Sequence, residues 1–250
     1  ESVPKYVQES AVEAIKFVGN NIILPSDRSG FMNLYIYNMN GQLQRTIGGK
    51  FDITEVYGYD AKTGDVYYQA AALAPTDRQV YVNHKNGKTE RLTDAEGWNS
   101  ALFSGDYQYF INTWSDYNTP YIYTTRTRAG KVISTLQDNS QLRQTIKEYG
   151  FCKREAFSFT TSEGVTLNGW MLRPLDFDAS KRYPVIMHQY SGPGSQQVKN
   201  AWSAGSMGQG GAYDSYLAQQ GFIVVSVDGR GTGGRGAEFE KCTYLNLGDL

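Results

Sequence analysis

The chain has 250 residues, 40% of them hydrophobic, which is enough apolar material for two domains of modest size. Its 24 basic and 25 acidic residues give a net charge of -1 without a basic stripe, so we expect no nucleic acid partner. The purely apolar runs, residues 222–225 among them, are too short to cross a membrane. Cys152 and Cys242 are too few for a disulfide scaffold and lack metal-ligand spacing, so we expect free thiols, no metal and no cofactor.

The first 137 residues repeat a pattern of strand, turn and strand. The copies begin at residues 34, 80 and 121, a spacing of 46 and then 41 residues, and an earlier strand precedes each one, at 21–24, 66–69 and 107–112. Several short strands at a period of about 40–50 residues predict β-propeller blades, with a generic antiparallel meander as the alternative. Three blades do not close a ring, so we expect the remaining blades to precede this chain or to lie in another chain.

Two of the repeated turns contain Asn-Gly pairs, Asn40-Gly41 and Asn86-Gly87. Such pairs are the strongest short hairpin signal, because both turn positions of the commonest two-residue hairpin have positive φ. The sequence therefore predicts two-residue turns at both places.

After the repeats, residues 138–150 predict a short connector helix with caps at 138–140, an apolar face and a stop at Gly150. A hairpin is expected over 157–172 around the turn 162–164. A buried strand at 183–187, a helix at 212–220 and a second buried strand at 222–227 then predict the beginning of a doubly wound α/β sheet. The expected division is blades at 1–137, connector at 138–150 and α/β segment at 151–250.

Each of these two buried strands leads into a turn rich in glycine, at 190–195 and 228–236. Strand ends of this kind meet at the carboxyl edge of an α/β sheet, where reactive sites are built. The chain contains no Gly-x-Ser-x-Gly motif, so a hydrolase interpretation requires a nucleophile from residues that follow Leu250. We therefore expect this chain to be a fragment.

Four segments resemble the dipeptidyl peptidase IV group of the prolyl oligopeptidase family. They are Tyr-Ser-Gly-Pro-Gly-Ser-Gln at 190–196, Asp-Gly-Arg-Gly-Thr-Gly at 228–233, Val-Tyr-Tyr-Gln-Ala at 66–70 and Arg-Gln-Val-Tyr at 78–81. The resemblance covers nearly the whole chain and is weakest before about residue 20. It implies the last three blades of a β-propeller followed by the N-terminal part of an α/β-hydrolase domain, truncated before the nucleophile elbow.

The resemblance also assigns roles to single residues. In the family, the tyrosine of the first turn donates its hydroxyl to the oxyanion of acyl transfer, and this role falls to Tyr190. The alternative is that Tyr190 is a packing residue of the core without a role in catalysis. The remaining candidates are a turn that supports the site (Ser191, Gly192, Pro193 and Gly194) and a structural turn (Asp228, Gly229, Arg230 and Gly231). The two histidines, His84 and His188, are expected to be structural, which leaves the whole catalytic triad after Leu250.

The activity implied by the resemblance is that of a serine exopeptidase that releases N-terminal dipeptides, X-Pro or X-Ala, by acyl-enzyme chemistry. A peptide substrate, a possible homodimer and an extracytoplasmic location come with it, and the chain alone is expected to be inactive. The glutamates that bind the substrate amino terminus in relatives lie in an earlier propeller segment, so exopeptidase action rests on the resemblance only.

Two other functions compete with this one. Gly229-x-Gly231-x-x-Gly234 formally matches a dinucleotide fingerprint, but no amphipathic helix pattern follows it, which disfavours an oxidoreductase. A non-catalytic propeller module is the stronger alternative, because aromatic residues make up 14% of the chain and could hold a peptide or a glycan.

Overall fold

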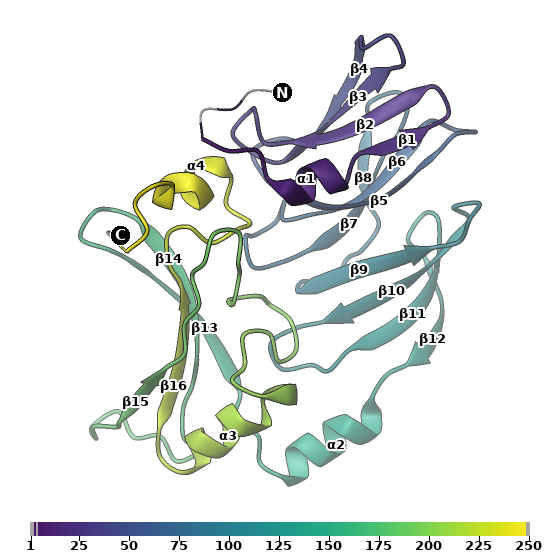
Figure 1. Cartoon of the computed structure of the whole chain (residues 1–250). Helices are drawn as coiled ribbons and strands as arrows, with labels where there is room; N and C mark the ends of the chain where they lie inside the picture. Colours follow the sequence, from purple (N-terminus) through teal and green to yellow (C-terminus); the bar gives the residue numbers. More distant parts are fainter. Residues whose placement is uncertain (1–2, 4, 249–250) are drawn as a thin grey trace.

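The structure is a computed structural model that describes residue 3 and residues 5–248. Within these residues, sixteen strands form four four-stranded sheets. Three sheets follow one another along one side of the molecule, and the fourth lies on the other side (Figure 1). In this part of the chain, no helix is long and apolar enough to cross a membrane.

The first three sheets are antiparallel meanders in which each strand pairs with its neighbours in sequence. After helix α1 (Glu9–Glu13), blade 1 contains β1 (Lys16–Val18), β2 (Asn21–Ser26), β3 (Asn33–Asn38) and β4 (Leu43–Ile47); blade 2 contains β5 (Ile53–Asp60), β6 (Asp65–Ala70), β7 (Gln79–Asn83) and β8 (Thr89–Arg91); blade 3 contains β9 (Trp98–Phe103), β10 (Tyr109–Ser115), β11 (Ile122–Thr127) and β12 (Val132–Gln137). The predicted repeat of blade units is confirmed. Each unit has one more strand at its start (β1, β5 and β9) than the pattern predicts.

The hairpin turns differ from the prediction. Among Asn40, Gly41, Asn86 and Gly87, only the two glycines have positive φ, at 76° and 89°. In blade 1 the Gly41 N–H donates to the Asn38 carbonyl at 3.0 Å, and the Asn38 N–H donates to the Gln42 carbonyl at 3.0 Å. This is a three-residue loop, a type I turn closed by a left-handed glycine, and it replaces the predicted two-residue turn. The same pair of bonds recurs in blades 2 and 3.

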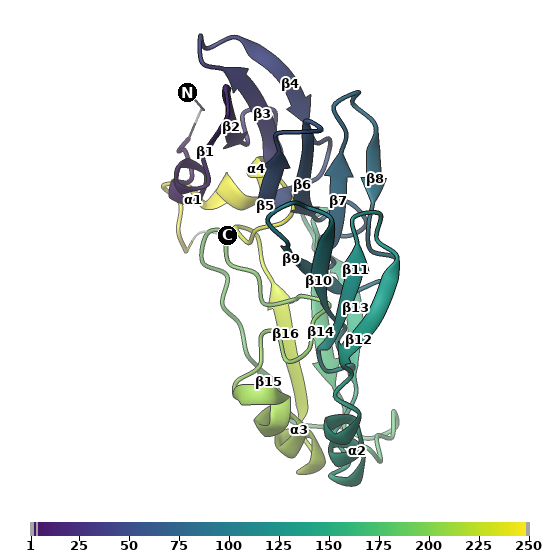
Figure 2. The same cartoon turned by 90° about the vertical axis from the view of Figure 1, so that its right-hand side faces the viewer.

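The two inner strands of blade 2 are buried on both faces. Every residue of β6 and β7 is buried, because successive side chains alternate between the two neighbouring blades. Val66 and Tyr68 belong to the core shared with blade 1, whereas Tyr67 packs with Val82 and Phe110 in the core shared with blade 3. Side chains on alternating faces therefore hold the three blades together. Figure 2 shows the blades from the side.

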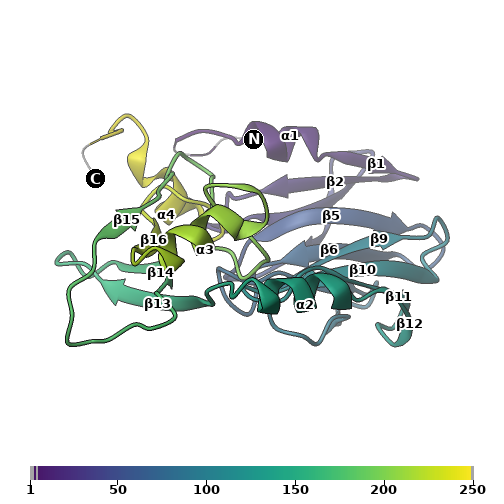
Figure 3. The same ribbon diagram turned by 90° about the horizontal axis from the view of Figure 1, so that it is seen from below.

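The predicted connector is helix α2 (Ser140–Glu148), which lies between blade 3 and the fourth sheet (Figure 3). Its end is as expected: Gly150 has φ 62°, and the Phe151 N–H donates to the Ile146 carbonyl at 3.1 Å, as in a Schellman motif. Its start differs, because Asn139 adopts a left-handed conformation and makes no capping bond to the helix. The Asp138 carboxylate instead accepts the Ser140 N–H at 2.9 Å.

The fourth sheet has the order β13 (Arg154–Thr160), β14 (Thr166–Leu172), β16 (Ile223–Asp228) and β15 (Val185–Met187). Only β15 and β16 are parallel. Helix α3 (Ala212–Gln219) contacts β14 and β16, and its Ala218 joins Trp170, Leu172 and Val224 in the core. The short helices η1 (Gln209–Gly211), α4 (Ala237–Glu240) and η2 (Lys241–Thr243) complete the described chain.

The prediction that residues 183–187 form a buried strand is wrong in its burial. The strand β15 begins at Val185 and lies at the edge of the sheet, where Val185 and Met187 are 58% and 57% exposed. An apolar run indicates a strand, but whether that strand is buried depends on what surrounds it in the folded protein. Strand β15 pairs with β16 on one side and, among the described residues, has no strand on the other.

Candidate active site

Two glycine turns meet at the carboxyl ends of β15 and β16: the first glycine turn (residues 190–196) and the second glycine turn (residues 228–236). Gly194 N–H donates to the Gly231 carbonyl at 3.1 Å, and Gly233 N–H donates to the Ser195 carbonyl at 2.9 Å. A Cβ atom on Gly233 would lie 3.0 Å from the Gly194 carbonyl oxygen, so the two backbones approach closely only because glycine stands there. The parallel strands thus deliver both turns to one edge.

Tyr190 stands at the start of the first glycine turn, and its side chain is 61% exposed. Among the described residues, its hydroxyl has no hydrogen-bond partner. A Cβ on Gly192 would lie 2.9 Å from that hydroxyl, so the glycine leaves room for the ring. Ser195 Oγ donates to the Gly192 carbonyl at 2.6 Å, and Ser191 Oγ accepts from Gln189 at 2.9 Å. The turn is therefore tied down while the Tyr190 hydroxyl is free to donate.

The second glycine turn is bound to its surroundings at its beginning. The Asp228 carboxylate accepts the N–H groups of Gln197 and Val198 at 2.8 and 3.1 Å. Burial raises the pKa of Asp228, and these two amide bonds act in the opposite direction. Arg230 forms an ion pair of 2.7 Å with Glu163, in the turn between β13 and β14. These contacts give Asp228 and Arg230 structural partners.

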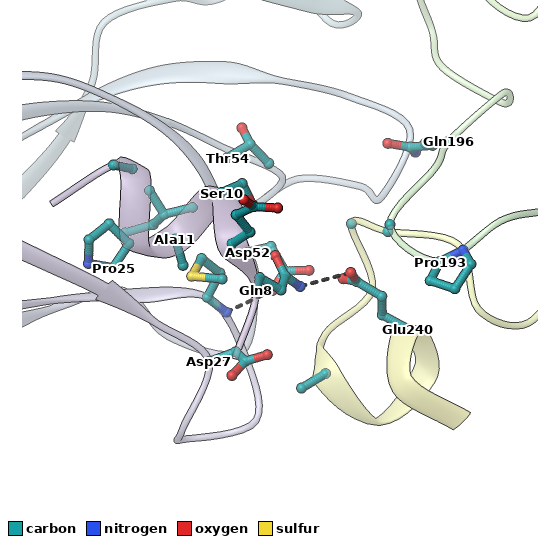
Figure 4. A pocket seen from close by; sticks show the side chains of 18 of the residues that line it. Gln8, Ser10, Ala11, Pro25, Asp27, Asp52, Thr54, Pro193, Gln196 and Glu240 are labelled. Carbon is teal, nitrogen blue, oxygen red and sulfur yellow. Dashed lines mark hydrogen bonds between the residues drawn. The ribbon is translucent and has the colours of Figure 1, made fainter. Parts of the chain in front are cut away.

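A cavity of about 1200 Å³ opens between the propeller blades and the two turns. Pro193, Gly194 and Gln196 line it from the first glycine turn, and the opposite wall comes from the N-terminal segment and blades 1 and 2 (Figure 4). A cavity of this size accommodates a short peptide or a drug-sized ligand. The first glycine turn therefore faces a space that a substrate could occupy.

Among the described residues, the polar contacts of the two histidines and the two cysteines do not involve the glycine turns. His84 Nδ1 is 3.2 Å from the Asp65 carboxylate in blade 2, and His188 Nδ1 is 3.2 Å from the Gly205 carbonyl oxygen. Cys152 and Cys242 are free thiols, as the sequence predicts. Burial raises the pKa of Cys152, which disfavours its reactive thiolate.

Comparison with known proteins extends these observations. A family model described as "Dipeptidyl peptidase IV (DPP IV) N-terminal region" matches residues 1–121, and one described as "Prolyl oligopeptidase family" matches residues 212–250. The chain belongs to the dipeptidyl peptidase IV group of the prolyl oligopeptidase family. The predicted fold class, β-propeller blades followed by the N-terminal part of an α/β-hydrolase domain, is confirmed.

Individual relatives agree with this family. The chain is 31% identical over 231 residues to a dipeptidyl peptidase 4 of Arthroderma otae and 30% identical over 234 residues to that of Trichophyton equinum. Each match covers 90% of this chain and 29% of the relative. The crystal structure of Porphyromonas gingivalis dipeptidyl peptidase 4 superposes with a TM-score of 0.92 and 40% identity, over 98% of this chain and 34% of that chain. The chain thus spans about a third or less of the length of these relatives.

In this member of the family, the glycines of the dinucleotide-like fingerprint serve the packing of the protein. A Cβ on Gly234 would lie 3.1 Å from the Arg78 guanidinium, and the Gly236 N–H donates to Asp52 at 2.8 Å. The sequence predicts no helix after Gly234, but the four-residue α4 is present, and its Ala237 N–H donates to the carbonyl of Gly30 at 2.8 Å. The amides of Gly236 and Ala237, at the start of α4, are therefore already bonded to the propeller.

Sequence reasoning missed a buried carboxyl group at this junction. Glu240 of α4 accepts a hydrogen bond of 2.7 Å from Gln8 Nε2, as Figure 4 shows. Burial, followed by the negative charge of Asp52, raises the pKa of Glu240 to about 7, and the bond from Gln8 acts in the opposite direction. Gln8 and Glu240 are 232 positions apart, so no local pattern could have paired them.

Proposed function

We propose that this chain is part of a serine peptidase that releases N-terminal dipeptides of the X-Pro or X-Ala class. The names of its relatives and the geometry of the first glycine turn support this proposal. In it, residues 1–137 are propeller blades, residues 138–150 the connector and residues 151–250 the first part of the peptidase domain. The outer limits of that division, residues 1 and 250, lie outside the described residues.

The free hydroxyl of Tyr190 carries the proposal. When a serine oxygen attacks the scissile carbonyl, the C=O π bond breaks and negative charge develops on the carbonyl oxygen. A hydroxyl already aimed at that oxygen stabilises the charge without reorganising solvent. This role for Tyr190 is supported by two observations: hydrogen bonds hold its turn, and its hydroxyl is unengaged among the described residues. The nucleophile, acid and histidine are assigned to residues outside this chain.

Substitution of Tyr190 by Phe in the full-length enzyme tests the role of this hydroxyl. We expect kcat for a chromogenic X-Pro substrate to fall roughly 10²–10³-fold, with little change in KM, because the donor meets charge only after attack. Stability should change by no more than about 1 kcal/mol, since no hydrogen bond is lost in the resting state. Tyr216→Phe, at an exposed tyrosine of α3, is the matched control. A kcat within about threefold of the unmodified enzyme would leave Tyr190 as a packing residue.

The proposal also expects the 250-residue chain alone to show no peptidase activity. The chain has no Gly-x-Ser-x-Gly motif, and oxyanion stabilisation without a nucleophile does not form an acyl-enzyme. Turnover of the X-Pro substrate by the purified chain, insensitive to a serine-directed inhibitor, would contradict this assignment.

Self-association is a further part of the proposal. Edge strand β15 exposes Val185 and Met187, and β12 exposes Val132, Ile133 and Leu136. Apolar side chains on strands at a sheet edge promote association with another chain. Light scattering of the chain at several protein concentrations measures its self-association. A monomer at every concentration would contradict the proposed homodimer.

A further inference from the structure

Arg78 is a blade 2 residue that reaches the first glycine turn. Its guanidinium is buried, with 4% exposure of the residue. Nη1 donates to the carbonyls of Pro75 and Asp77 at 2.9 and 2.8 Å, and Nη2 donates to Gln196 Oε1 at 2.8 Å. One planar fork therefore binds a propeller loop and the end of the first glycine turn at the same time.

Gln196 completes a closed set of bonds. Its Nε2 donates to the Pro75 carbonyl at 2.8 Å and to the Val198 carbonyl at 3.2 Å. Because a guanidinium only donates, Arg78 orients the Gln196 amide with its oxygen toward the guanidinium and its nitrogen toward the Pro75 carbonyl. Both polar ends of Gln196 are thus used, and its position is set by the propeller.

The position of Arg78 is itself determined inside the propeller. Its backbone N–H donates to the Gly97 carbonyl at 3.0 Å, and its carbonyl accepts the Asn99 N–H at 2.9 Å, which joins blade 2 to blade 3. The guanidinium carbon lies 4.4 Å from the centre of the Trp98 ring. Burial lowers the pKa of Arg78 to about 10, with the charges of Asp52 and Asp77 opposing, so the group is still a cation at neutral pH.

The position of Gln196 is transmitted to Tyr190 over a short path. Ser195 Oγ lies 3.3 Å from the Tyr190 carbonyl and donates to the Gly192 carbonyl at 2.6 Å. The Ser195 carbonyl in turn accepts the Gly233 N–H at 2.9 Å, so both glycine turns share this anchor. The segment from Tyr190 to Gln196 is therefore held at both of its ends.

We propose that Arg78 is a positioning residue of the proposed peptidase: through Gln196 it holds the first glycine turn, and with it the Tyr190 hydroxyl, in register with the propeller. The inference rests on the proposed function. If Arg78 has this role, the propeller influences the rate of the chemical step and also forms a wall of the cavity.

Two substitutions in the full-length enzyme test this positioning role, one at Arg78 and one at Gln196. Arg78→Lys keeps the charge but loses the fork, and Gln196→Met removes both amide contacts from the turn while keeping the length of the side chain. We expect kcat for an X-Pro p-nitroanilide to fall roughly 10–100-fold in each, because a small misplacement of a stabilising group is costly in rate. KM should stay within about threefold. An X-Pro aldehyde, which forms a tetrahedral adduct, should bind more weakly by the same factor as kcat falls.

Arg126→Lys is the matched control. Arg126 is also a buried blade arginine, at 8% exposure, but its partners Asp94, Leu92 and Gly130 all lie in the blades. A purely structural role for Arg78 predicts that Arg78→Lys and Arg126→Lys lower the melting temperature alike and leave kcat and aldehyde affinity unchanged. That result would overturn the inference. Should Arg78→Lys fail to fold, the same decision rests on Gln196→Met.

A double-mutant cycle with Tyr190→Phe separates the inference from the proposed function. If Arg78 acts through Tyr190, then Arg78→Lys costs much less in kcat when Tyr190 is already Phe. Full additivity would overturn the inference while leaving Tyr190 in its role. An unmodified full-length protein that turns over no X-Pro substrate would refute the proposed function. In that case, the amide hydrogen-exchange rates of residues 190–196 still test the contact from Arg78. Equal rates in Arg78→Lys and in the unmodified protein would refute the positioning role of Arg78 as well.

Discussion

The carboxyl group of Glu240 makes the stability of the junction between α4 and blade 1 depend on pH. Glu240 is buried, accepts a hydrogen bond from Gln8 at 2.7 Å, and has a pKa raised to about 7 from its ordinary value of 4.5. Burial is the main cause, and the charge of Asp52 adds to it. Glu240→Gln removes the titration but keeps an oxygen that can accept from Gln8.

The sign and size of the effect follow from linkage. Between pH 4.5 and 7 the folded state keeps a proton that the unfolded state has lost, so stability falls as pH rises. Below pH 4.5 both states are protonated and the penalty is absent. For these two pKa values, the loss from this single group between pH 5 and pH 8 is about 2–3 kcal/mol.

Urea unfolding of the chain, followed by tryptophan fluorescence at pH 5, 6, 7 and 8, measures the effect at a single protein concentration. We expect the stability of Glu240→Gln relative to the unmodified chain to rise by about 2–3 kcal/mol across this range. Glu238→Gln, at an exposed residue of the same helix, controls for the loss of one negative charge. Parallel pH curves for the unmodified chain and Glu240→Gln would refute the reasoning.

Two further predictions concern stability alone. Gly130 and Gly87 close equivalent turns at φ 85° and 89°, so alanine at either site should cost about 1–2 kcal/mol. A Cβ at Gly130 would also lie 2.3 Å from the Leu92 carbonyl oxygen, so in urea melts Gly130→Ala should cost about 1–3 kcal/mol more than Gly87→Ala, and equal costs would contradict this contact. Asp214→Asn removes the buried partner of Arg154, 3.3 Å away, and should cost about 3–5 kcal/mol in the same assay, whereas a cost below about 1 kcal/mol would show that the pair is dispensable.

Local patterns in the sequence determine much of the fold. Period-two alternation and the glycines at 41, 87 and 130 locate the blade hairpins, because a strand shows its two faces every second residue and a left-handed turn position needs glycine. Helix α2 is likewise located by its apolar face and by Gly150, which ends it. The turn type is less accessible, since Asn-Gly is compatible with two-residue and three-residue loops.

The sequence likewise indicates some features of the candidate site and not others. The sequence alone indicates that two glycine turns follow two strands, and these turns meet because β15 and β16 are parallel neighbours. The sequence does not indicate that β15 is an exposed edge, because exposure depends on what covers the strand.

Only the tertiary structure joins Arg78 to Gln196, which are 118 positions apart. It likewise pairs Gln8 with Glu240, 232 positions apart. Such contacts leave no periodic pattern in the sequence, because each depends on one side chain whose partner is brought near by the packing of the blades against the residues of the α/β segment. Local backbone preferences and apolar periodicity therefore determine the elements, while long-range packing decides which polar groups meet and which carboxyl group is forced to keep its proton.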